Sequence, residues 1–105
     1  RGAGGSNTTA LGYVNALRTR ANAPSVSLGE LDLNFILDER AKELHWECHR
    51  RTDLIRFGKF SGGSYLWPWK GGIATGTATP SIRNLFPIPA GSLAANPKLQ
   101  QNPGY

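Results

Sequence analysis

The stretch LDLNFILDERAKELHWECHRRTDLIRFG, residues 31–58, carries the strongest structural signal in this chain. Apolar residues recur in it at spacings of three and four, which is the pattern of one helix face. Asp32 is suited to cap the helix N-terminus, and the basic run from His49 suits the negative end of the helix dipole. We predict a helix from Leu33 to Arg51, about 28 Å long at 1.5 Å per residue. Its apolar positions are Leu33, Ile36, Leu37, Ala41, Leu44 and Cys48.

The same stretch ends in a predicted corner. Thr52 and Asp53 can cap a short turn through Phe57, and Gly58 can close that turn in a left-handed conformation. Acidic and basic residues alternate along the stretch, at spacings that allow ion pairs on a helix and bidentate arginine–carboxylate contacts at the corner. We expect a structural ion-pair network made of Arg40, Glu43, Glu47, Arg51, Asp53 and Arg56.

A second amphipathic helix is predicted upstream, within residues 8–24. Thr8 or Thr9 can serve as its N-cap, and Pro24 stops it. Two arginines in the last turns suit the helix dipole. The apolar stripe consists of Ala10, Leu11, Tyr13, Val14, Leu17 and Ala21.

Residues 59–105 are predicted to form a loop-rich C-terminal arm. The prolines at 80, 87, 89, 97 and 103 forbid long helices and central strands there. Large apolar side chains nevertheless punctuate the arm, and disordered segments are poorer in such residues. We expect an ordered Pro/Gly-rich arm that inserts these side chains into something larger. They are Leu85, Phe86, Ile88, Leu93 and Leu99.

The composition argues against stability as an independent domain, although the length alone permits a compact, loop-rich one. The chain has 105 residues, of which 13 are glycine and 7 are proline, and a chain of this size buries only about two-thirds of its unfolded surface. We expect it to pack on an N-terminal portion of a longer chain. The start Arg1-Gly-Ala-Gly-Gly has no initiator Met and no signal peptide, so an export signal or lipid-carrying cysteine is expected upstream.

The net charge of +5 makes nucleic acid a partner to consider. The 12 basic residues are scattered, however, with Arg50-Arg51 as the only adjacent pair, and no nucleic-acid-binding motif is present. We therefore expect no nucleic-acid partner. Cys48 is the single cysteine, so an intramolecular disulfide is excluded. Its place in the apolar pattern predicts a buried, inert thiol.

Two residue patterns have spacings that a metal site or an acid–base pair could use. His45 and His49 have the i, i+4 spacing of a zinc pair, but a third ligand is missing and the order His-Trp-Glu-Cys-His differs from the metalloprotease motif. Glu39, Glu43 and Glu47 form a row that could supply a glycosidase pair. Interleaved cations would keep those carboxylates ionised, which is unsuitable for a general acid. We expect no metal site, no cofactor and no catalytic residue.

Tyr65, Trp67 and Trp69 lie in a Gly/Pro-rich loop and are the candidate ligand-binding residues. Flat aromatic faces can stack on the apolar faces of sugar rings. The alternative is that these rings are buried anchors of the arm, and the sequence leaves both interpretations open.

Several segments together resemble the SusD/RagB family. ALGYVNALRTRANAP at 10–24 is similar to its last tetratricopeptide-like helix, and ILDERAKELHWECHRRTDLIRFG at 36–58 to its C-terminal signature helix and corner. NLFPIP at 84–89 and NPKLQQNPGY at 96–105 resemble its chain terminus. The family pattern more often has glycine where Cys48 stands.

The resemblance implies a mainly α fold in which residues 1–105 are the C-terminal portion of a larger SusD-like domain. Residues 8–24 would be the last tetratricopeptide-like helix, 32–58 the signature helix and corner, and 59–105 the arm. The two helices are expected to run antiparallel.

The resemblance also implies a lipoprotein on the outer-membrane surface that captures oligosaccharides, without catalysis, for a SusC-type TonB-dependent transporter. Most of this chain would then be scaffold. The alternatives are a purely structural segment that docks the transporter and a glycosidase that uses Glu43 and Glu47.

Overall fold

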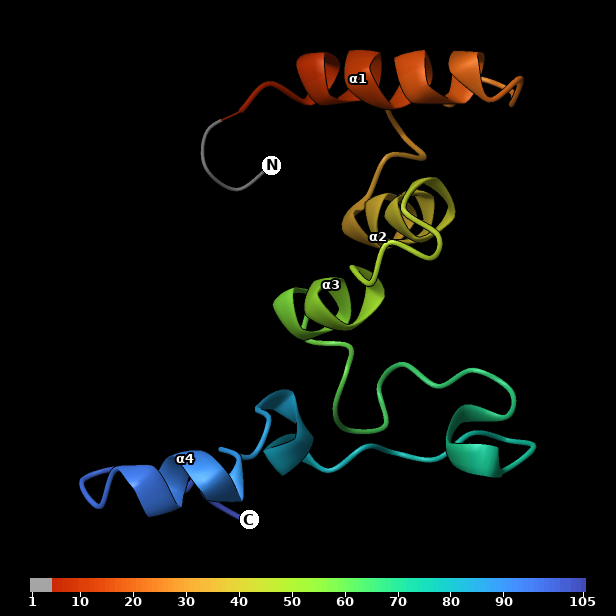
Figure 1. Ribbon diagram of the computed structural model, residues 1–105. Coiled ribbons are helices and arrows are strands. Elements are labelled where there is room, and N and C mark those ends of the chain that lie inside the picture. The colour runs from red at the N-terminus through yellow and green to blue at the C-terminus, as the bar shows by residue number, and fades with distance from the viewer. Residues whose placement is uncertain (1–4) are drawn as a thin grey trace. The chain divides into compact units, whose positions relative to one another are not determined.

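The computed structural model of this chain describes residues 5–105 (Figure 1). Within them the regular structure is helical, and the only strand-like pairing is an isolated bridge between Gly62 and Thr79. The prediction of a mainly α fold is therefore confirmed. The α-helices are α1 (Asn7–Arg20), α2 (Leu33–Glu43), α3 (Arg50–Arg56) and α4 (Ala90–Ala95), and the 3-10 turns are η1 (Lys70–Gly72) and η2 (Ser81–Asn84).

The chain divides into two compact units, with the boundary between Glu47 and Cys48. The first unit contains α1 and α2, and the second contains α3, both 3-10 turns and α4. Among the described residues, the buried hydrophobic side chains are Leu31, Leu37 and Leu54. With so few buried apolar groups, specific polar and aromatic contacts must fix much of each unit.

Helix α1 starts two or three residues earlier than the predicted caps would allow. Ser6 is the N-cap, and its hydroxyl accepts from the Thr9 amide at 3.4 Å. Ser6 has an extended backbone, as an N-cap requires, whereas Thr8 and Thr9 lie inside the helix. The predicted caps were therefore wrong, and serine supplies the same chemistry two or three positions earlier.

Helix α1 also ends before Pro24 is reached. Asn22 has φ of 58°, its amide donates to the Thr19 carbonyl at 3.1 Å, and the Ala23 amide donates to the Arg18 carbonyl at 2.8 Å. This is the Schellman motif, which closes a helix through one left-handed residue. Asparagine tolerates that conformation better than most residues, so the stop signal is Asn22.

The predicted helix from Leu33 to Arg51 is interrupted. Helix α2 stops at Glu43, turns occupy residues 44–48, and α3 begins at Arg50. Trp46 and Cys48 have φ of 67° and 61°, which a right-handed helix cannot contain. The apolar pattern correctly marked the buried Leu37 in α2, but it carried no sign of the two left-handed residues that follow.

The interruption also overturns the prediction of a buried thiol, because Cys48 is exposed. A left-handed backbone favours glycine, since a Cβ there approaches the following carbonyl oxygen. This gives a physical reason for glycine to be suited to the position of Cys48.

The predicted stop at Gly58 is confirmed. Gly58 has φ of 66° and donates to the Ile55 carbonyl at 3.0 Å, while the Lys59 amide donates to the Leu54 carbonyl at 2.7 Å. This is a second Schellman motif, placed one residue after the C-cap Phe57.

The C-terminal arm is ordered by side-chain amides that bind its backbone. Gln101 accepts from the Ile88 amide at 2.7 Å and donates to the Ile88 carbonyl at 3.0 Å. Asn102 donates to the Phe86 carbonyl at 2.7 Å, and the Tyr105 hydroxyl donates to the Leu85 carbonyl at 2.9 Å. The segment 82–88 and the last residues thus fold onto each other, which proline-rich backbone cannot achieve through strand pairing.

None of the helices described by the structure has the length and apolar character needed to cross a membrane. Helix α1, the longest, has 14 residues, against about 20 for a bilayer.

Replacing Cys48 by glycine is expected to stabilise the protein. Relief of the left-handed Cβ contact, worth about 1–2 kcal/mol, outweighs the entropic cost of about 0.5–1 kcal/mol for glycine. We expect a net gain of about 0.5–1 kcal/mol in the free energy of unfolding, measured with denaturant.

Cys48→Ala is the matched control, because alanine removes the thiol but keeps the Cβ. It should leave the free energy of unfolding unchanged within about 0.5 kcal/mol. Equal stabilities of the glycine and alanine variants would contradict the left-handed assignment.

Candidate functional site

Two of the three predicted aromatic residues meet in one pocket. Tyr65 and Trp67 pack edge-to-face, with ring centroids 5.9 Å apart and planes at 62°. They line a pocket of about 430 Å³ together with Arg50, Arg51, Leu54 and Phe60, which we call the Tyr65–Trp67 pocket. All six residues belong to the second unit. Such a concave, mainly apolar surface with a few polar groups is suited to a small ligand or a single sugar ring.

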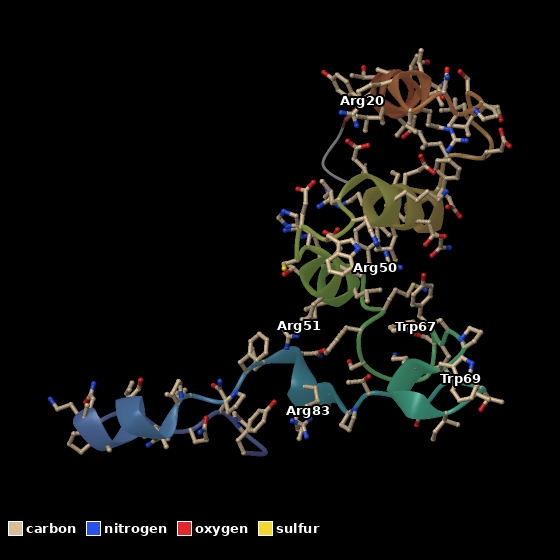
Figure 2. All side chains as sticks on the ribbon, turned by 45° about the vertical axis from the view of Figure 1, so that its right-hand side comes forward. Arg20, Arg50, Arg51, Trp67, Trp69 and Arg83 are labelled. Atoms are coloured by element: carbon tan, nitrogen blue, oxygen red, sulfur yellow. The ribbon has the colours of Figure 1, made fainter. Side chains whose placement is uncertain are left out.

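Trp69 lies outside this pocket. Its side chain is 69% exposed, against 41% for Trp67, and its backbone is left-handed with φ of 66°. Figure 2 shows both tryptophans on the loop that leads into η1. The three predicted residues therefore form a pair and a separate, more exposed ring.

Arg50 fixes the tyrosine of the pair. Its guanidinium donates to the Tyr65 hydroxyl at 2.9 Å and lies 5.8 Å from the ring centroid. The hydroxyl is thus held from α3, and the ring can present an edge and a face in a defined orientation.

Arg51 connects α3 to the arm. It donates to the carbonyl oxygens of Arg83 and Asn84, at 2.6 and 3.3 Å. Its guanidinium also lies 5.0 Å from the Phe60 ring centroid and 3.9 Å from that of Phe86. One side chain therefore contacts two backbone carbonyls and two aromatic rings of the second unit. The sequence had predicted carboxylate partners for it instead.

Sequence reasoning missed Lys70, which is buried in contact with both residues of the Tyr65–Trp67 pair. Its side chain is 6% exposed, its ammonium is 3.3 Å from the Phe60 carbonyl and 3.4 Å from the Tyr65 carbonyl, and it lies 4.7 Å from the Trp67 ring centroid. A signal was available, because Lys70 is the only cation within the aromatic loop.

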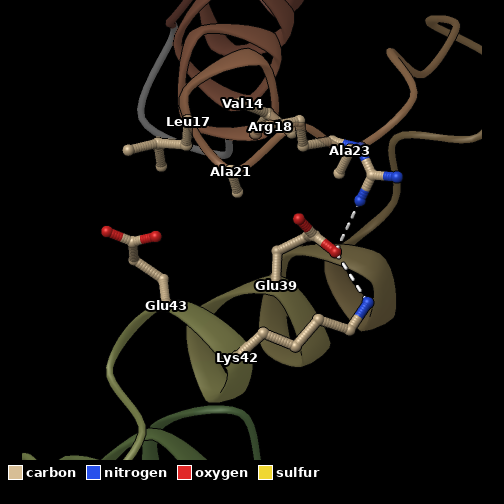
Figure 3. A pocket seen from close by; sticks show the side chains of 8 residues that line it. All are labelled: Val14, Leu17, Arg18, Ala21, Ala23, Glu39, Lys42 and Glu43. Carbon is tan, nitrogen blue, oxygen red and sulfur yellow. Dashed lines mark hydrogen bonds and ion pairs between the residues drawn. The ribbon is translucent and has the colours of Figure 1, made fainter.

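Two of the three glutamates considered for a glycosidase, Glu39 and Glu43, face α1 (Figure 3). Glu39 pairs with Arg18 and with Lys42, each at 2.8 Å. Hydrogen bonding from Lys42, followed by that from Arg18, lowers the pKa of Glu39, although partial burial opposes the shift. The carboxylate is held ionised, so it cannot act as the acid of a glycosidase.

The other two glutamates do not continue the row. Glu43 pairs with Arg20, and Glu47 lies beyond the end of α2 in the exposed turn segment. The expected i, i+4 relation of Glu47 to Arg51 was wrong, because no continuous helix joins them. Asp53 is buried in the first turn of α3, and Arg56 is exposed in its last turn. A network that joins Arg40, Asp53 and Arg56 with the others stays a prediction.

His45 and His49 lose their helical spacing at the same break. His45 packs against Trp46, with ring centroids 5.8 Å apart, and His49 precedes α3. No group of three or more His, Cys, Asp or Glu side chains arranged to hold a metal occurs in residues 5–105.

Comparison with known proteins places the chain in a family. It matches the SusD family over residues 2–105. It is also 42% identical, over 96 residues, to the starch-binding protein SusD of Bacteroides thetaiotaomicron. The aligned part covers 91% of this chain and 17% of that relative. The chain belongs to the SusD family and spans a small part of the relative's length.

Removing the Glu39 carboxylate should reduce stability in a pH-dependent way. Because its folded pKa lies below the ordinary 4.5, ionised Glu39 stabilises the fold above that value, and the effect is lost as the pH falls through the folded pKa. We expect Glu39→Gln to lower the free energy of unfolding by about 1 kcal/mol or less near neutral pH.

The difference from wild type should shrink in acid below pH 4.5. Glu47→Gln, at an exposed position outside α2, is the control and should give no such trend. A Glu39→Gln difference that is constant with pH would contradict the ion pairs with Arg18 and Lys42.

Proposed function

We propose that the protein is a non-catalytic glycan-binding subunit on the outer-membrane surface. In this proposal it is a lipoprotein that captures oligosaccharides for a SusC-type TonB-dependent transporter. The observation that carries the proposal is the SusD-family match across residues 2–105. The 42% identity to a starch-binding protein supports an α-glucan as the ligand to test first.

The contribution of residues 1–105 is proposed to be mostly scaffold. Three buried leucines are a small core for the described residues, and large apolar side chains stay exposed on both units. Examples are Tyr13 at 72%, Phe86 at 69% and Leu85 at 56%. Such side chains are suited to pack against a preceding portion of the same chain.

The Tyr65–Trp67 pocket is the proposed exception to the scaffold role. Its aromatic pair offers faces for sugar C–H groups, and its volume of about 430 Å³ lies within the range of small-molecule sites. Trp69, outside the pocket, is the weaker candidate for a sugar contact.

A second candidate role is protein interaction, in which this segment docks the transporter and contacts no glycan. The exposed apolar residues of the arm favour it, since such groups are enriched where partners bind. A catalytic role has no support of this kind, because Glu39 and Glu43 are neutralised by arginine and lysine partners.

The two roles are separated by measuring maltoheptaose binding to the full-length protein by calorimetry. If the pocket holds a sugar, Trp67→Ala should weaken binding about threefold to tenfold, as expected for the loss of one stacking face. Trp69→Ala is the matched control in the same loop and should change the dissociation constant less than twofold.

Unchanged affinity in both variants would overturn the pocket as a glycan contact and favour the interaction role. Absence of binding by the wild-type protein to maltoheptaose and to a wider panel of oligosaccharides would overturn glycan capture itself.

A further inference from the structure

Lys70 is a buried cation, and the groups around its ammonium compensate the charge. An ammonium withdrawn from water is costly unless its charge is compensated. Here the three N–H donors face two carbonyl oxygens and one indole ring, those of Phe60, Tyr65 and Trp67. No carboxylate lies within ion-pairing distance of Lys70 in the part of the chain that the structure describes.

All three partners of the ammonium line the Tyr65–Trp67 pocket, whereas Lys70 does not. The ammonium therefore contacts three of the six lining residues without lining the pocket itself. Trp67 is 41% exposed and Lys70 only 6%, so the indole stays partly open to solvent while the ammonium that lies 4.7 Å from its ring centroid is buried.

The backbone of Lys70 is fixed as firmly as its side chain. Its amide donates to the Trp67 carbonyl at 3.1 Å, and its carbonyl accepts from the Thr77 amide at 3.0 Å. Gly76, with φ of 77°, passes so close that a Cβ there would lie 2.6 Å from the Trp67 carbonyl oxygen. The loop from 65 to 77 is thus closed tightly around Lys70.

We propose that Lys70 is a positioning residue for the glycan contact: it holds the Trp67 ring by its inner face and so makes the pocket a one-sided stacking platform. This inference rests on the proposed glycan role of the pocket. A ring whose inner face is clamped loses little conformational entropy when a sugar stacks on its outer face, and that saving raises affinity.

The test combines a spectroscopic signal from Trp67 with binding of maltoheptaose. The full-length protein is labelled with 5-fluorotryptophan, and the Trp67 resonance is assigned from its absence in Trp67→Phe. Lys70→Met removes the cation and both hydrogen bonds at similar volume. It should shift or broaden the Trp67 signal and weaken maltoheptaose binding about threefold to tenfold.

Lys70→Gln is the second variant, for use if the methionine variant does not fold. It keeps an N–H donor for the carbonyls and removes the cation beneath the ring, so the Trp67 signal should still move. Lys98→Met, an exposed lysine of the arm, is the matched control and should leave signal and affinity unchanged.

The outcomes distinguish the two proposals. If Trp67→Ala weakens binding but the Lys70 variants change neither the Trp67 signal nor the affinity, the positioning role is overturned and the pocket stands. If Trp67→Ala leaves affinity unchanged, the pocket is not a glycan contact, and the role of Lys70 falls with it.

Discussion

The fold of each unit depends on a guanidinium group that stacks on aromatic rings while it donates to backbone carbonyls. Arg51 does this in the second unit, between the rings of Phe60 and Phe86 and on the carbonyls at 83 and 84. Arg18 does it in the first unit, where it lies over Phe35, donates to the Pro24 carbonyl at 2.6 Å and pairs with Glu39. A planar group with five donors in a fixed geometry can satisfy several partners in one place.

This form of stabilisation suits a chain with so little apolar core. Side-chain amides bind loop backbone in the same way, but without a charge. Asn15 binds both the amide and the carbonyl of Val26, at 2.8 and 3.0 Å, and Gln101 does the same at Ile88. These contacts order backbone that has no helix or strand partner. They leave the apolar side chains of the arm on the surface, where a longer chain or another protein can bind them.

Sequence patterns predicted the helical class, the stop at Gly58 and the absence of long regular structure in the arm, because periodicity, glycine and proline act locally. The break after Glu43 was missed because left-handed conformations at Trp46 and Cys48 have no residue signature. The aromatic loop was found from its composition, but periodicity could not show that Tyr65 and Trp67 pair while Trp69 stands apart. Lys70 was missed, and Arg51 was assigned carboxylate partners, because the groups they contact are backbone carbonyls and aromatic rings, which the sequence does not show as complementary charges.

Hydrogen–deuterium exchange of the full-length protein with Arg51→Met is the most direct test of the claim that one guanidinium organises the second unit. The substitution keeps an apolar chain against Phe60 and Phe86 and removes the donors to the carbonyls at 83 and 84. We predict faster exchange at the Gly62 amide, which binds Thr79, and at the Ile88 amide, while α1 in the first unit is unchanged. Unaltered protection at both amides would contradict the account and would mean that the arm is held independently of Arg51.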